Sequence, residues 1–200
     1  MFKQTLGLFL ILLLLLVNTI RLPEAKAAAA SVPLSIVVNG TLVVSDDAND
    51  TMAGENPTKN VSISVTPDLG ATTATGSANM RLRTNNAAWR LTAQRTASSA
   101  GSTGILDADV SVTVTKSAGS TANAASGALV APFTAQTNLS SIPTLTAADV
   151  VSGTAKTSSM LDNTNANNYF QVNTTYGIQP DFFYSPGTFS STITYSLVSP

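Results

Sequence analysis

Carboxylates and hydroxyls are the main groups in this chain that could do acid–base chemistry. The 200 residues include no histidine and no cysteine, which excludes the usual bases near neutral pH, thiol nucleophiles and most zinc sites. Asp107 and Asp109 are two positions apart, so at the start of a strand they would share one face, as an acid pair requires. Turn capping and solubility are the interpretation we favour. We therefore expect no catalytic residue.

A second acidic group lies between Asp46 and Asp50, in the stretch SDDANDT. Its concentrated oxygen ligands would suit calcium. The stretch lacks the spaced ligands, central glycine and closing glutamate of an EF-hand loop. A solvated turn is the preferred interpretation, and we expect neither a metal nor a cofactor.

Aromatic side chains are the other candidate binding groups. Trp89, the only tryptophan, has the same alternation phase as Leu91 and is expected in the core. Phe182, Phe183 and Tyr184 are consecutive, so they cannot all face the core from one strand. This cluster is the better candidate for contact with a partner, or with a glycan if the chain is a carbohydrate-binding module.

The first residues predict export. Lys3 precedes an apolar run from Leu6 to Val17, and the sequence Ala25-Lys26-Ala27 has the small-x-small pattern of a cleavage site. The run is shorter than the roughly 20 residues of a transmembrane helix. We expect residues 1–27 to be a cleaved secretory signal. The mature chain, 28–200, would then act in the periplasm, at the cell surface or outside the cell, without a membrane span.

The composition narrows the function further. The formal net charge is −1 and only 10% of residues are charged, against roughly 25% in typical globular proteins. This gives no electrostatic basis for binding nucleic acid or an anionic membrane. Without cysteine there is no disulfide framework, so packing alone must hold the fold. The length favours one domain after the signal.

Alternation of apolar and polar residues predicts strands throughout the mature chain. It recurs over residues 34–38, 41–44, 60–65, 78–83, 89–94, 109–115, 169–176 and 189–197. Short strands separated by turn residues are typical of an antiparallel, immunoglobulin-like β-sandwich. We expect an all-β fold of this class in a single domain, 28–200.

Turn residues predict which strands are neighbours. Asn39-Gly40 is a favoured hairpin turn between the first two runs. Thr84-Asn85-Asn86 predicts a second hairpin between 78–83 and 89–94, with the arginines of both strands in solvent. Leu145 to Val151 is the stretch that predicts a brief helical turn.

The last residues, PGTFSSTITYSLVSP, carry a family resemblance. A glycine precedes alternating apolar residues, with an aromatic near the terminus, which is similar to the closing strand of chaperone–usher pilins and spore-coat-U-like exported subunits. The resemblance implies that Gly187 opens this strand. It also implies that a periplasmic chaperone contacts Phe189, Ile193, Tyr195 and Leu197. The aromatic is not penultimate here, because Ser199 and Pro200 follow.

The beginning of the mature chain is compatible with the same mechanism. Val32, Leu34, Ile36 and Val38 alternate and could form the strand that one copy adds to another, or the first strand of a complete domain. We expect a non-enzymatic, secreted or cell-surface structural or adhesive protein, pilin-like if it assembles by strand addition. Its partners would be further copies, a chaperone or a surface assembly protein. A carbohydrate-binding module and, less favoured, a carboxylate-dependent hydrolase are the alternatives.

Overall fold

The structure, a computed structural model, describes residues 34–46, 58–159 and 167–200. The chain divides into two units, Met1–Val38 and Asn39–Pro200. Residues 34–38 are the described part of the first unit, and they form no helix or strand. The strand expected there and the hairpin expected at Asn39-Gly40 are therefore wrong. The expected cleavage site and the acidic residues 47–50 lie outside the described residues.

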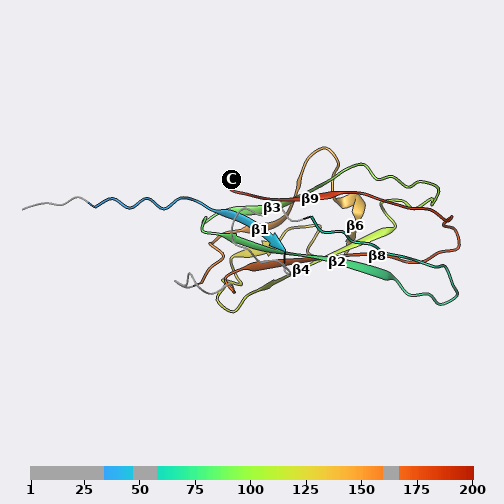
Figure 1. The fold of residues 1–200 in the computed structure, drawn as a ribbon, viewed down its shortest axis with the longest axis horizontal. Helices are drawn as coiled ribbons and strands as arrows, with labels where there is room; N and C mark the ends of the chain where they lie inside the picture. The colour runs from blue at the N-terminus through green and yellow to red at the C-terminus, as the bar shows by residue number, and fades with distance from the viewer. Residues whose placement is uncertain (1–33, 47–57, 160–166) are drawn as a thin grey trace, which may run out of the picture. The chain divides into compact units, whose positions relative to one another are not determined.

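Asn39–Pro200 folds as an all-β sandwich of two antiparallel sheets (Figure 1), as the alternation predicts. The first sheet has five strands, in the order β1 (Leu42–Asp46), β2 (Ala74–Thr84), β8 (Phe170–Ile178), β4 (Val110–Ala118) and β6 (Thr137–Asn138). The second has four, in the order β5 (Gly127–Leu129), β7 (Ala148–Gly153), β3 (Trp89–Arg95) and β9 (Ile193–Val198). A short 3₁₀ helix, η1 (Leu139–Ser141), follows β6. Across the described ranges, no helix has the length and apolar character needed to cross a membrane.

The core lies between the sheets and is built from alternate residues of the long strands. In β3, Trp89, Leu91 and Ala93 are fully buried, which confirms that Trp89 is a core residue. From the opposite sheet, Phe170 meets the Trp89 ring edge-on, with ring centroids 5.5 Å apart. Such aromatic contacts bury large apolar areas, and no disulfide supports them because the chain has no cysteine.

The hairpin expected at Thr84-Asn85-Asn86 is wrong, because β2 and β3 lie in different sheets. The turn residues bind other parts of the chain instead. Asn85 donates its side-chain amide to the carbonyl oxygen of Asn39 and accepts the amide of Thr41, each at 2.8 Å. Thr84 accepts and donates hydrogen bonds with the hydroxyl of Thr157. These bonds to distant residues hold the chain where it passes from β2 in one sheet to β3 in the other.

Two further expectations are corrected by tertiary contacts. Arg83 is buried rather than solvated, and its guanidinium donates to Asn168 Oδ1 at 2.8 Å and Ser45 Oγ at 3.1 Å. Residues Leu145 to Val151 contain no helical turn. Their second half begins strand β7, where Val150 and Val151 are fully buried. β-branched residues favour strands, which explains this outcome.

Candidate functional site

The candidate site begins with β9, which is the terminal strand of its sheet. β9 pairs with β3 on one side, from Arg95↔Ile193 to Arg90↔Val198. No strand among the described residues pairs with its other side. An edge strand presents unpaired backbone donors and acceptors, which can pair with another chain.

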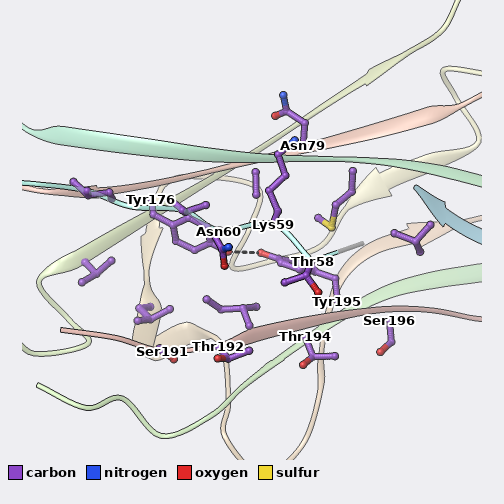
Figure 2. A pocket seen from close by; sticks show the side chains of 18 of the residues that line it. Thr58, Lys59, Asn60, Asn79, Tyr176, Ser191, Thr192, Thr194, Tyr195 and Ser196 are labelled. Carbon is purple, nitrogen blue, oxygen red and sulfur yellow. Dashed lines mark hydrogen bonds between the residues drawn. The ribbon is translucent and has the colours of Figure 1, made fainter. Parts of the chain in front are cut away.

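A groove of about 660 Å³ opens beside β9, between the two sheets. Thr58 to Val61 and Ile63 form a further wall of the groove. Figure 2 shows Thr58 beside Tyr195 and Asn60 beside Tyr176, while the side chain of Lys59 extends toward Asn79. Core side chains line the depth of the groove, namely Met80, Val110, Leu139 and Tyr176. The groove therefore reaches from the edge of β9 to the interior of the sandwich.

Residues 60–66 cross this region in a form that the sequence only partly predicts. Val61, Ile63 and Val65 are half-buried and pack against the core, while Ser62 and Ser64 are exposed. The alternation is as expected, but the segment is not a strand of either sheet. Gly76 permits its close approach, because a Cβ there would lie 2.6 Å from Val61 Cγ1.

A chain of hydroxyl groups lies inside the groove. The phenol of Tyr176 lies 2.9 Å from that of Tyr195, which donates to Thr174 Oγ1 at 3.3 Å. Burial raises the pKa of Tyr176, and the neighbouring Tyr195 raises it further. Burial also raises the pKa of Tyr195, although its hydrogen bonds oppose this effect. Both phenols therefore stay neutral at physiological pH.

The C-terminal residues singled out in the sequence are brought together along β9 and its approach. Ile193, Tyr195 and Leu197 alternate inward, half-buried, and Phe189 also packs against the core. Gly187 does not open the last strand, because β9 begins at Ile193. Gly187 is exposed and lies close to the loop before β4, since a Cβ there would lie 2.6 Å from Ser102 Oγ. The apolar face of the last strand thus completes this chain's own core, while its backbone edge remains open.

The N-terminal candidates belong to the first unit of the chain. Leu34, Ile36 and Val38 are 84%, 76% and 79% exposed, and Val32 lies outside the described residues. Their role as an added strand remains a prediction. Their exposure leaves large apolar surface to be covered, which soluble proteins normally avoid.

The aromatic cluster lies elsewhere, on the loop between β8 and β9. Phe182 and Phe183 are exposed, whereas Tyr184 is half-buried. Partial burial raises the pKa of the Tyr184 phenol, and the nearby carboxylates of Asp109 and Asp181 raise it further. The expectation that three consecutive aromatics cannot all enter the core is therefore confirmed.

Asp107 and Asp109 contact different groups. Asp107 Oδ2 lies 2.6 Å from the guanidinium of Arg95, while Asp109 Oδ2 accepts the backbone amide of Leu106. Each carboxylate thus has a separate structural contact. Within the described ranges, no group of three or more acidic side chains is arranged to hold a metal ion.

The sequence interpretation missed the contact of Tyr176 with Tyr195 in the groove and the ion pair of Arg95 with Asp107. Tyr176 and Tyr195 both have the inward phase of their strands, which is the signal that could have placed them together. The ion pair of Arg95 with Asp107 has no such signal, because it joins the end of β3 to the loop before β4. Both features depend on how the sheets face one another.

Comparisons with known proteins do not extend this description. No family model matches the chain, and neither the curated proteins nor the solved structures that were searched contain a match.

Proposed function

We propose that this chain is a non-enzymatic, exported structural or adhesive subunit that joins other copies by strand addition at β9. The open edge of β9 beside the groove is the observation that carries the proposal. Strand addition uses backbone hydrogen bonds for affinity and alternating side chains for register. An immunoglobulin-like topology, secretion and cell-surface location belong to the same proposal.

The exposed apolar residues of segment 34–38 support its assignment as the added strand. Leu34, Ile36 and Val38 share one face of an extended chain, and Val37 lies on the other. All four are exposed. In a second copy, the first three would face the groove while Val37 faced away. A chaperone that holds the same edge before assembly is part of this proposal.

The solution state of residues 28–200 tests the proposal. We expect light scattering to show oligomers of the mature chain. A chain shortened to begin at Asn39 should remain monomeric and should bind a peptide of residues 31–38. Ile36→Asp should abolish assembly, because burying an unpaired carboxylate is costly. Val37→Asp is the matched control and should retain it. A stable monomer of the full mature chain would refute assembly by strand addition.

A further inference from the structure

Three loops meet at the end of the sandwich where β2 and β4 begin and β8 ends. Ile178, the last residue of β8, pairs with Ala74 of β2 on one side and Val110 of β4 on the other. Residues 67–73, 100–109 and 179–190 are therefore brought together. Figure 1 shows them as teal, green and red loops at the right-hand end of the sandwich.

These loops carry large apolar side chains that face solvent. Leu69 is 91% exposed, Leu106 65%, Phe182 71% and Phe183 81%. We call these four residues the loop-end patch. Large apolar residues on one end of a domain are unfavourable in water unless another molecule covers them.

Hydrogen bonds hold the loops against one another. Gln179 donates its side-chain amide to the carbonyl oxygen of Ala71 at 2.6 Å. The backbone amide of Ser185 donates to the carbonyl oxygen of Thr103 at 3.0 Å. The patch is therefore presented by connected loops, which lowers the entropy that a partner must overcome on binding.

Each of the three loops combines an exposed apolar residue with a carboxylate. The backbone amide of Leu69 donates to Asp68 Oδ1 at 2.7 Å, and that of Leu106 to Asp109 Oδ2 at 2.8 Å. In the third loop, the amide of Phe183 donates to Asp181 Oδ1 at 2.7 Å. The backbones of Leu69, Leu106 and Phe183 are thus each held by a hydrogen bond to a neighbouring carboxylate.

The charge of the loops selects the kind of partner. Residues 67–73, 100–109 and 179–190 contain no lysine or arginine. Asp107 is already paired with Arg95, which leaves Asp68, Asp109 and Asp181 as acidic groups beside the patch. A complementary surface would present positive charges around apolar side chains.

Two other classes of partner fit less well. Loops that enter a lipid surface usually combine apolar residues with lysine or arginine, which bind the phosphate groups. These three loops contain no lysine and no arginine. Sugar rings stack on flat aromatic faces, but Leu69 and Leu106 provide none. A polypeptide uses both the leucines and the carboxylates.

We propose that the loop-end patch binds a polypeptide partner that presents lysine or arginine beside apolar side chains. This surface is separate from the edge of β9 and does not depend on strand addition.

A pair of labelled synthetic peptides tests this proposal by fluorescence anisotropy on the mature chain. One peptide has leucines and lysines at helical spacing, and the other has glutamate in place of each lysine. We expect the lysine peptide to bind at least about tenfold more tightly, and this preference to fall at high salt. Equal binding of the two peptides would overturn the proposal.

Matched variants locate the binding surface. Phe182→Ser with Phe183→Ser should weaken binding of the lysine peptide about tenfold or more, since buried aromatics dominate such interfaces. Leu42→Ser with Val198→Ser, at the opposite end of the sandwich, should leave it within about twofold. Asp181→Asn, which still accepts the Phe183 amide, should weaken binding more than Asp149→Asn. Equal losses in either comparison would contradict the assignment.

Phosphatidylcholine vesicles and a glycan array complete the test. Binding to either one that is lost in the double phenylalanine variant would assign the patch to lipid or sugar and overturn the polypeptide proposal. Absence of such binding, together with the peptide preference, would support it.

Discussion

The hydroxyl of Tyr176 on β8 lies 2.9 Å from the hydroxyl of Tyr195 on β9, so a hydrogen bond joins the two sheets beside the groove. Tyr195 in turn donates to Thr174 on β8. Because Tyr195 donates to Thr174, Tyr176 is the donor to Tyr195. The open side of the sandwich is therefore connected by polar groups that satisfy one another away from water.

Removing the central hydroxyl should weaken this connection. Tyr195→Phe keeps the ring but deletes the acceptor for Tyr176 and the donor to Thr174. We expect the free energy of unfolding to fall by about 1–2 kcal/mol, measured by urea denaturation. Ser196→Ala, at an exposed neighbour on β9, should change it by no more than about 0.5 kcal/mol. Equal effects would mean that the hydroxyl chain does not stabilise the sandwich.

The same tyrosines predict a loss of stability at alkaline pH. Both phenols have a pKa raised by burial, whereas in the unfolded chain they ionise near pH 10. Above pH 10 the unfolded state therefore releases protons that the folded state retains, and the free energy of unfolding decreases as the pH rises further. The double variant Tyr176→Phe with Tyr195→Phe should have a shallower decrease in denaturation experiments between pH 9 and 11. An identical slope would contradict this origin.

Gly153 should not tolerate a methyl group. A Cβ at this position would lie 2.0 Å from Trp89 Cε2, and the Trp89 Nε1–H donates to the carbonyl oxygen of Ala155 at 2.8 Å. Moving the ring would break that bond. We expect Gly153→Ala to destabilise the fold by about 3 kcal/mol or more, with a red shift of tryptophan fluorescence. Ser152→Ala is the neighbouring control, and a wild-type melting temperature for Gly153→Ala would disprove this packing.

Two ion pairs of the sandwich, Arg95 with Asp107 and Arg90 with Asp149, should differ in strength. The Arg95 side chain is 8% exposed and Asp107 27%, whereas Arg90 is 51% and Asp149 33% exposed. Arg95 also donates to the carbonyl oxygens of Leu139 and Ile142.

We expect Asp107→Asn to lower the free energy of unfolding by about 2–4 kcal/mol, because it leaves a buried guanidinium without its counter-charge. Asp149→Asn should lower it by less than about 1 kcal/mol. Chemical denaturation of both variants at two salt concentrations measures the two losses in the free energy of unfolding. Similar losses would show that burial does not control the strength of these pairs.

The sequence pattern predicted which face of a strand is buried better than it predicted which strands lie next to one another. The alternation of Trp89, Leu91 and Ala93 correctly placed all three in the core. The polar turn at Thr84 to Asn86 was misassigned as a hairpin, because its amides and hydroxyls bind residues far away in the chain. Turn chemistry is local, but the contact that satisfies a turn can come from any segment.

The candidate site was only partly predictable for the same reason. The inward phase of Ile193, Tyr195 and Leu197 follows from period-two alternation. The groove depends instead on residues 60–66, which alternate like a strand but lie outside both sheets. Nothing in their sequence distinguishes a paired strand from a packed extended segment.

The sequence by itself determined that this is an all-β chain without histidine or cysteine, because composition and the two-residue period are local properties. It also determined that Phe182, Phe183 and Tyr184 could not all enter the core. Only the tertiary structure decided that β2 and β3 separate into different sheets, that β9 lies at an edge and that Tyr176 meets Tyr195. Strand pairing joins residues distant in the chain, so its free energy depends on the whole set of contacts rather than on any one segment.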